Sequence, residues 1–194
     1  LEHSMSPSAS SAICVMSGRP MLPAAVAAAI MTFGGAHGPG AAHTYMLNYY
    51  LERAYKEGKS LKEMAKKVIQ EHMEADHPVM GIGQPQHIYG DPRAIPTFMK
   101  TRELGTAGVY HDFQIEIQEE LNRVRVAQGR NKLYPNMIGA GNSTLMDLGF
   151  SGLAGWIIGC VTRGFSCAVH AIETVKKGHA WAASTREPMV QLLD

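Results

Sequence analysis

A histidine surrounded by glycines is the first feature of the sequence that could do chemistry. His37 lies in the segment Gly-Gly-Ala-His-Gly-Pro-Gly, between two apolar stretches. Glycines let a backbone turn tightly and approach a ligand closely, and an imidazole in such a turn can donate or accept a hydrogen bond. His37 is therefore a candidate catalytic residue, and the structural alternative is a histidine on a surface loop.

A second irregular segment, residues 80–93, carries further polar candidates. It reads Met-Gly-Ile-Gly-Gln-Pro-Gln-His-Ile-Tyr-Gly-Asp-Pro-Arg, and its Gln84 and His87 offer an amide and an imidazole to a ligand. Asp91 and Arg93 flank a proline, which is typical of helix capping with a local ion pair. Alternatively, the planar guanidinium of Arg93 faces a ligand carboxylate. The Gly-Ile-Gly at 81–83 is too short for a nucleotide-binding fingerprint.

The histidines and cysteines do not form a metal-binding pattern. His43 follows His37 by six residues, which is off the spacing of four that places two ligands on one helix face. The sequence has no HExxH motif, no Cys/His knuckle and no carboxylate cluster, so we expect no metal. Three widely spaced cysteines, Cys14, Cys160 and Cys167, fit a reducing, cytoplasmic compartment better than a disulfide framework.

Composition excludes several classes of protein. The chain has 194 residues, of which 45% are hydrophobic and 18% charged, so it is too apolar to be disordered. A net charge of +1 provides no basic surface for nucleic acid. The apolar stretches 21–33 and 145–170 are interrupted by Pro23 and Arg163, so we expect no membrane span. No signal peptide is visible, and a start at Leu1 suggests a fragment or a trimmed product.

Helical periodicity dominates the sequence and predicts an all-α fold. Ser60 and Glu63 form a capping box, and apolar residues then recur at helical spacing over 61–75. A second amphipathic pattern runs over 109–127. Further helices are expected over 9–16, 23–32, 41–55, 96–104, 152–162 and 166–177. Short strands are expected only near 79–82 and 87–89.

The succession of these segments resembles the citrate synthase superfamily. It runs from an alanine-rich helix and the His37 loop, through residues 81–94, to Leu-Tyr-Pro-Asn at 133–136 and Leu-Ala-Gly-Trp at 153–156. Each motif alone is weak, but their order and spacing together are specific. The resemblance covers residues 6–188, and the tetrads Asp-Pro-Arg-Ala and Leu-Tyr-Pro-Asn contribute most to it.

The resemblance implies a citrate synthase-like, two-domain enzyme that acts as a homodimer on an acyl-coenzyme A and a small carbonyl or carboxylic acid. Residues 1–40 and 132–194 would form part of the large domain, whose N-terminal helices are missing. Residues 41–131 would form the small domain that closes over the coenzyme A site. The backbone of that site would come from Met80, Gly81, Ile82 and Gly83. The chain matches the family's C-terminal part, or is a shortened member similar to stand-alone citryl-CoA lyases.

The implied catalytic positions depart from the family's pattern. His37 matches the histidine that stabilises the enol oxygen of the thioester. The second family histidine, which polarises the acceptor carbonyl, falls on Gln84, and the carboxylate base falls on Ile138. An amide can donate a hydrogen bond but cannot deliver a proton, and an isoleucine cannot act as a base.

The implied substrate-binding positions also differ in part. Arg93 is retained, and His3 resembles a histidine that contacts oxaloacetate. The arginine expected before Leu-Ala-Gly-Trp is Gly152 in this sequence. An arginine donated across the dimer has its nearest counterpart at Arg186.

These departures leave several functions open. We expect a citryl-CoA lyase-like enzyme whose acceptor carries fewer carboxylates than oxaloacetate. His87 is slightly favoured over Asp147 as the group that replaces the missing base. One alternative is a catalytically degenerate paralogue that pairs with a complete subunit. Another is an acyl-CoA thioesterase, which needs no acceptor.

Overall fold

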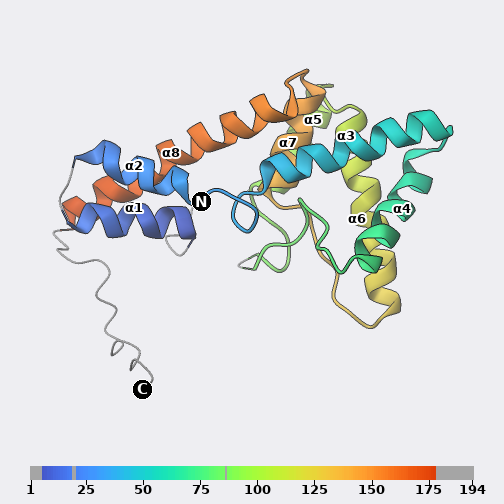
Figure 1. Ribbon diagram of the computed structural model, residues 1–194, viewed down its shortest axis with the longest axis horizontal. Helices are drawn as coiled ribbons and strands as arrows, with labels where there is room; N and C mark the ends of the chain where they lie inside the picture. Colours follow the sequence, from blue (N-terminus) through green and yellow to red (C-terminus); the bar gives the residue numbers. More distant parts are fainter. Residues whose placement is uncertain (1–5, 19–20, 86, 178–194) are drawn as a thin grey trace. The chain divides into compact units, whose positions relative to one another are not determined.

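The computed structural model describes residues 6–18, 21–85 and 87–177, and these residues form eight α-helices (Figure 1). The helices are α1 (Pro7–Ser17), α2 (Leu22–Met31), α3 (Gly40–Glu57), α4 (Leu61–Glu74), α5 (Ala94–Glu103), α6 (Val109–Ala127), α7 (Met137–Asp147) and α8 (Gly152–Lys176). The predicted all-α fold is confirmed. The two expected strands are wrong, because strand-like pairing in the described ranges is limited to one isolated bridge between Ile82 and Pro135.

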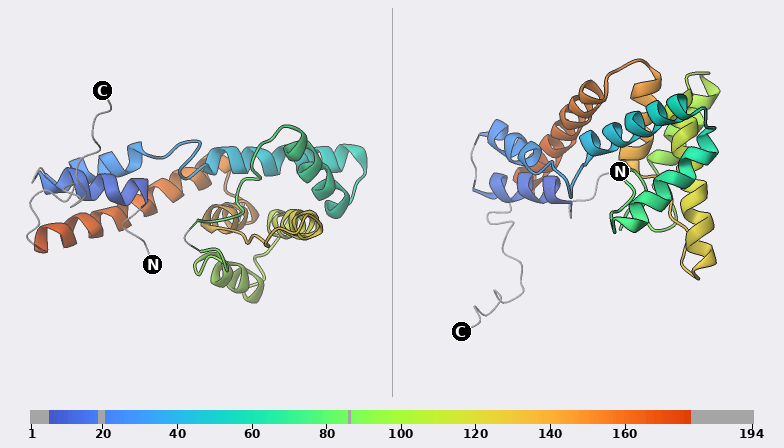
Figure 2. Two further views of the ribbon diagram at one scale, coloured as in Figure 1. Left: turned by 90° about the horizontal axis from the view of Figure 1, so that it is seen from below. Right: turned by 45° about the vertical axis from the view of Figure 1, so that its right-hand side comes forward.

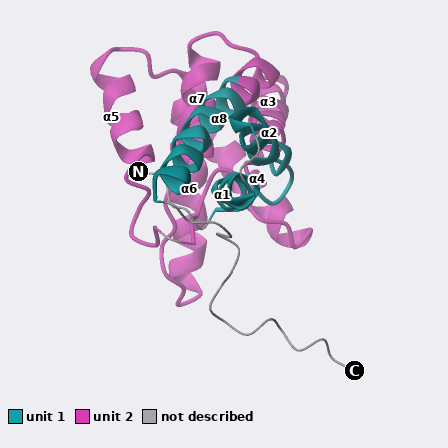
Figure 3. Cartoon of the chain, turned by 90° about the vertical axis from the view of Figure 1, so that its left-hand side faces the viewer, with its two compact units in different colours: residues 1–37, 158–194 teal, residues 38–157 magenta. Residues whose placement is uncertain are grey.

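The chain divides into two compact units (Figure 3). Unit 1 comprises Leu1–His37 and Ile158–Asp194, and unit 2 comprises Gly38–Ile157. The helix α8 begins in unit 2 and continues into unit 1. The division into a small domain at 41–131 and a large-domain portion stays a prediction.

Unit 1 is built on small side chains. Its core, between α1, α2 and the later part of α8, consists of Ala9, Ala12, Ala25, Ala29, Cys167 and Ala171. A Cβ atom on Gly164 would lie only 3.1 Å from Ile30 Cδ1, so the backbone of α8 comes close to α2. Small residues therefore let these helices pack closely, as dense protein interiors require.

Unit 2 has a larger apolar core between α3, α4, α6 and α7. Its fully buried members include Leu47 of α3, Met64 and Val68 of α4, and Phe113 and Ile117 of α6. Views from two other directions show α6 beside α7 and α4 beside α6 (Figure 2). The amphipathic stripes expected over 61–75 and 109–127 therefore face each other across this core.

Local sequence signals set the ends of α3 and α4 as expected. The Glu63 N–H donates to Ser60 Oγ at 3.3 Å, and the Ser60 N–H donates to Glu63 Oε2 at 2.9 Å, which confirms the capping box. α3 ends at Glu57 and is capped by Gly58, whose φ of 60° is the left-handed conformation that glycine adopts readily.

Two helices differ from the sequence-based expectation. No helix was expected over α7, whose glycines at 139 and 141 lower its intrinsic helix propensity. Its N-cap Asn136 nevertheless accepts hydrogen bonds from the N–H groups of Ile138 and Gly139, and its inner face is buried. α8 is one continuous helix and not two, because Gly164, at the expected break, packs closely against α2.

Asp147, at the end of α7, caps the N-terminus of α6. Its Oδ2 accepts hydrogen bonds from the N–H groups of Gly108 and His111, and its Oδ1 accepts one from Tyr110, all at 2.9 Å. First-turn N–H groups have no partner within their own helix, and a negative charge there also complements the helix dipole. Both carboxylate oxygens are therefore engaged in holding α6 against α7.

The surface of α8 is unusually apolar. It is the one helix in the described ranges whose length and composition would allow it to cross a membrane, a property that core helices of soluble proteins share. Within unit 1 its exposed side carries a stripe of large apolar residues, opposite the buried Cys167 and Ala171. We call Val161, Phe165, Val169 and Ile172 the α8 stripe.

Replacing the carboxylate that caps α6 should destabilise unit 2. We expect Asp147→Ala to lower the free energy of unfolding by about 2 kcal/mol, because three backbone donors lose a charged acceptor. Urea denaturation followed by circular dichroism measures this loss. Glu119→Ala is the matched control, since it removes one negative charge from an exposed site on α6. Equal stability of the two variants would contradict the capping role.

Candidate functional site

The predicted coenzyme A loop, Met80 to Gly83, is held by the segment that leads into α7. Gly83 N–H donates to the Tyr134 carbonyl at 2.8 Å, and Asn136 N–H donates to the Gly81 carbonyl at 3.0 Å. The Asn136 side chain also donates from Nδ2 to the Gly83 carbonyl at 2.8 Å. Two of the motifs that carry the family resemblance, residues 81–94 and 133–136, are thus joined by backbone hydrogen bonds.

Close backbone contact between Gly81 and Gly139 fixes the distance between this loop and α7. A Cβ atom on Gly139 of α7 would lie 2.3 Å from the Gly81 carbonyl oxygen, so any side chain there would displace the loop. Gly81 has a φ of 80°, which is strained for every residue with a side chain. The glycines are therefore required by packing and by backbone conformation.

A buried histidine lies directly under the loop. His43 of α3 is fully buried, and a Cβ atom on Gly81 would lie 2.6 Å from its Nε2. His43 Nδ1 lies 3.4 Å from Asn142 Nδ2, which donates to it, and its Nε2–H donates to Gln114 Oε1 at 2.7 Å. Burial lowers the pKa of His43 from 6.5 to about 4, against a smaller upward effect of the Gln114 hydrogen bond. The ring is therefore neutral at physiological pH.

Asp91 and Arg93 form the local ion pair that their spacing indicated. Asp91 Oδ1 accepts from Arg93 Nε at 3.0 Å, and Oδ2 accepts from Arg93 Nη2 at 2.9 Å. Oδ2 also accepts from the N–H of Met137, at the start of α7. These hydrogen bonds and the guanidinium charge hold the pKa of Asp91 below its usual range, although burial, the largest single effect, raises it. The substrate-binding role of Arg93 stays a prediction.

Of the other catalytic candidates in unit 2, Gln84 and His87 follow this loop in sequence, whereas Ile138 and Asp147 belong to α7. Gln84 and His87 are half-buried and belong to one turn, in which the His87 N–H donates to the Gln84 carbonyl at 3.2 Å. Ile138 is half-buried in the first turn of α7, where its side chain offers no base. Asp147 is engaged in capping α6, which argues against it as the replacement base.

In unit 1, His37 belongs to a polar cluster that the sequence reading did not anticipate. His37 Nε2 lies 2.9 Å from Ser8 Oγ, and Arg163 Nε donates to the same oxygen at 2.8 Å. Arg163 also donates from Nη2 to Ser6 Oγ. The Phe33 ring lies beside the imidazole, with 5.1 Å between ring centroids. Ser8 thus links a half-buried imidazole to a guanidinium.

Arg163 is the candidate residue that sequence reasoning missed. In the sequence it stands out only as an interruption of an apolar stretch, although a lone arginine among apolar residues and glycines is itself a signal for a functional charge. Burial lowers the pKa of Arg163, and Cys167 opposes this shift. At Gly152, where the family resemblance placed an arginine, a Cβ atom would lie 2.7 Å from the Thr44 side chain, so a larger residue does not fit.

The predicted site residues are distributed over both units. His37 belongs to unit 1, whereas Gln84, His87, Arg93 and the loop at 80–83 belong to unit 2. His3 and Arg186 lie outside the described residues. Their predicted roles are therefore untested.

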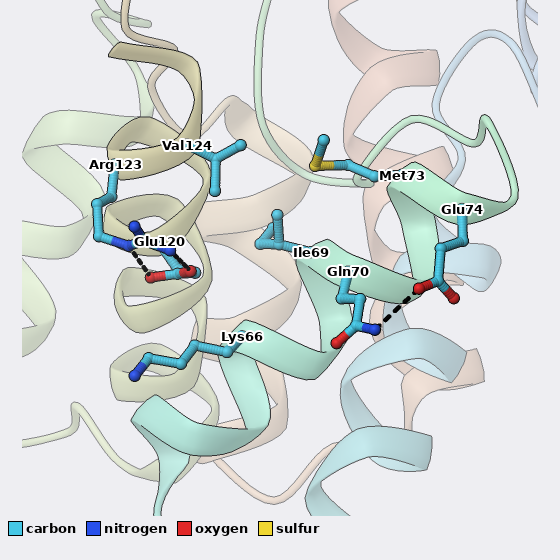
Figure 4. A pocket seen from close by; sticks show the side chains of 8 residues that line it. All are labelled: Lys66, Ile69, Gln70, Met73, Glu74, Glu120, Arg123 and Val124. Atoms are coloured by element: carbon cyan, nitrogen blue, oxygen red, sulfur yellow. Dashed lines mark hydrogen bonds and ion pairs between the residues drawn. The ribbon is translucent and has the colours of Figure 1, made fainter. Parts of the chain in front are cut away.

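A surface groove in unit 2 is separate from these residues. It lies between α4 and α6, with a volume of about 450 Å³, and Ile69 and Val124 supply apolar lining (Figure 4). On its α6 side, Glu120 accepts two hydrogen bonds from Arg123, at 2.6 and 2.8 Å. None of the predicted site residues lines it. Within the described ranges, no group of three or more His, Cys, Asp or Glu residues could hold a metal ion.

Comparison with known proteins connects these features to one family. The family model described as citrate synthase, C-terminal domain, matches residues 1–182. The solved structure of citryl-CoA lyase from Hydrogenobacter thermophilus has a TM-score of 0.71 and 26% identity, over 100% of this chain and 68% of that chain. No curated protein matches the sequence.

Two further solved structures show the same fold at lower identity. Citrate synthase from Thermotoga maritima MSB8 has a TM-score of 0.72 and 18% identity, covering 100% of this chain and 50% of that chain. ATP citrate lyase from Methanosaeta concilii, in complex with (3S)-citryl-CoA, has a TM-score of 0.67 and 12% identity. The match covers 100% of this chain and 32% of that chain. This chain therefore corresponds to only part of each of these proteins.

The burial of His43 predicts a specific loss of stability in acid. The unfolded chain binds a proton at this residue near pH 6.5, whereas the folded chain binds it only near pH 4. As the pH falls from 6.5 to 4, the unfolded state holds more protons and stability decreases, by about 3 kcal/mol in total. Urea denaturation at pH 7 and pH 4.5 measures this slope.

His43→Gln should lose most of this pH dependence, because an amide does not titrate. His77→Ala is the control, since His77 is exposed and its removal should leave the slope unchanged. An unchanged slope in His43→Gln would contradict the assignment.

Proposed function

The chain belongs to the citrate synthase family, and on that premise we propose that it is an acyl-CoA-dependent carbon–carbon lyase or synthase. Its second substrate would be a small carbonyl compound or carboxylic acid other than oxaloacetate. The observation that carries the proposal is the cluster of His37, Ser8 and Arg163. It combines a group able to stabilise an enolate oxygen with a cation able to bind a carboxylate.

The charge that develops in the reaction explains why an imidazole is needed. Forming or breaking the carbon–carbon bond next to a thioester passes through an enolate, which carries negative charge on the thioester oxygen. A neutral imidazole N–H can donate to that oxygen, and the Ser8 hydrogen bond fixes the orientation of the ring. A guanidinium removed from bulk water attracts a carboxylate more strongly than one in full solvent. We infer that Arg163 supplies the cationic contact that Gly152 cannot.

The loop at Met80 to Gly83 supports binding of the acyl-CoA. Its glycines expose backbone, and its position is fixed by hydrogen bonds from residues 134–136. A rigid backbone edge can pair with a planar base and tolerates changes of side chain. In unit 2 we infer that Gln84 donates to the acceptor carbonyl and that His87 replaces the base missing at Ile138.

Removing the imidazole should abolish turnover but leave coenzyme A binding intact. For His37→Ala we expect a decrease in kcat of about 100-fold or more, because the enolate oxygen loses its donor. For Arg163→Gln we expect a raised KM for the carboxylate substrate. Activity is measured as acyl-CoA consumption or formation with a panel of small oxo acids, and coenzyme A binding by calorimetry.

His77→Ala, an exposed histidine of unit 2, is the control for this experiment. Unchanged turnover in His37→Ala would contradict the proposal. So would undetectable binding of acetyl-, propionyl- and succinyl-CoA at millimolar concentration.

A second candidate is a non-catalytic subunit that pairs with a complete family member. Ile138 at the position of the family's carboxylate base favours this candidate, because no carboxylate of the chain replaces it in the first turn of α7. In that case the native complex should contain a second citrate synthase-like chain. A homogeneous homodimer with turnover would exclude it.

We also propose that the protein forms a homodimer through the α8 stripe. Val161 and Phe165 are 64% and 76% exposed, which is unusual for large apolar side chains aligned on one helix face. Pairing with a second copy would bury these side chains, so that protein and not a lipid bilayer would shield the α8 stripe from water.

Introducing a charged residue into the α8 stripe should dissociate this dimer. We expect Phe165→Glu to shift the protein toward the monomer in analytical ultracentrifugation, with at least about tenfold weaker association, because a carboxylate cannot be buried unpaired. Lys177→Glu introduces the same residue just beyond α8 and outside the stripe, and should leave the dimer intact. A monomeric wild-type protein would contradict this model.

A further inference from the structure

We propose that His43 is a positioning residue. Its ring contacts Gly81 and sets the position of the loop at Met80 to Gly83, and thereby the affinity for the acyl-CoA. The inference rests on the proposed function insofar as it assigns that loop to coenzyme A. Its structural part, that the imidazole is the support on which the loop lies, stands on contacts within unit 2.

The loop is confined by three different contacts. Gly139 meets the Gly81 carbonyl from α7, and Asn136 holds the Gly81 and Gly83 carbonyls. His43 closes the remaining side, where its ring lies against Gly81 so tightly that not even a Cβ atom would fit. Gly81 contributes no side chain that could adjust, so a change in the size of residue 43 moves the loop backbone itself.

Hydrogen bonds at both ring nitrogens hold His43 in place. Asn142 Nδ2 donates to His43 Nδ1 at 3.4 Å and to the Gly40 carbonyl at 3.1 Å, and this second bond sets the orientation of the amide. The His43 proton is therefore on Nε2, from which it donates to Gln114 Oε1. The ring is thus fixed by α6 on one side and by α7 on the other.

The same network reaches the start of α3. Gly40, which accepts from Asn142, is the first residue of α3, and the chain enters this helix directly from His37 through Gly38 and Pro39. Trp156 Nε1 donates to the Gly38 carbonyl at 3.3 Å, and a Cβ atom on Gly40 would lie 2.3 Å from the Trp156 ring. Within unit 2, His43 therefore links the anchored beginning of α3 to the loop at 80–83.

An apolar residue could not replace His43, because it would form neither of these hydrogen bonds. A leucine at position 43 would leave Gln114 Oε1 and one hydrogen-bonding direction of Asn142 unsatisfied in a fully buried site. A glutamine could satisfy both amides, but it lacks the flat ring that contacts Gly81. The two substitutions thus separate the hydrogen bonds of His43 from its shape.

The test combines loop protection with ligand affinity. Hydrogen exchange is measured at the Gly83 and Asn136 amides, which donate the hydrogen bonds that hold the loop. Calorimetry with acetyl-CoA gives the affinity. For His43→Leu we expect about tenfold faster exchange at these amides and about tenfold weaker binding, the consequence of losing one buried hydrogen-bond partner.

His43→Gln should keep a melting temperature close to that of the wild type but still exchange the two loop amides faster. Ala29→Gly is the control for general destabilisation. Ala29 is fully buried in the core of unit 1, a cluster that contains no residue of the loop. This control should lose thermal stability while loop exchange and acetyl-CoA affinity remain at wild-type values.

The outcomes separate this inference from the proposed function. Wild-type exchange at the Gly83 and Asn136 amides in His43→Gln would overturn the positioning role. So would an equal effect of Ala29→Gly on the loop. If the wild-type protein binds no acyl-CoA, the proposed function fails, and the exchange data still decide whether His43 supports the loop. If His43→Leu does not fold, His43→Gln decides.

Discussion

The contact of Gly81 with Gly139 and His43 is the constraint on which the rest of unit 2 depends. The backbone of Gly139 contacts Gly81 on one side, and the neutral, buried ring of His43 contacts Gly81 on the other. Contacts this close permit one arrangement of the loop, since dense interiors do not deform continuously. Two further groups hold the first turn of α7, from which Gly139 contacts the loop. Asp91, paired with Arg93, accepts from the Met137 N–H, and Asn136 accepts from the Ile138 N–H.

The two units offer different chemistry. Unit 2 supplies a backbone edge held by hydrogen bonds from residues 134–136, which under the proposed function would contact a planar part of the ligand. Unit 1 supplies an imidazole, hydroxyl groups and a guanidinium, which suits a carbonyl and a carboxylate. Both kinds of surface enter the function proposed for this chain. The family resemblance aligns a carboxylate base with Ile138, and under the proposed function His87 takes that role.

Three polar side chains of unit 2 hold helices against one another. Asp147 holds α6, Asp91 holds the start of α7, and His43 joins α3 to α6 and α7. Asp91 and His43 are buried and would be costly to bury without their hydrogen-bond partners, and Asp147 is half-buried. This use of charge explains why Asp147, a candidate for the replacement base, is already committed to structural hydrogen bonds.

The sequence by itself determined the all-α class, the capping box of α4, the Gly58 terminus of α3 and the order of motifs that identifies the family. These are local or linear properties, which periodicity and spacing express directly. Only the tertiary structure decided that α7 is a helix, that α8 is continuous, that Asp147 is a cap and that Arg163 joins His37 through Ser8. Such features arise from contacts between residues distant in the chain, and the energy of those contacts outweighs the local propensity of glycines.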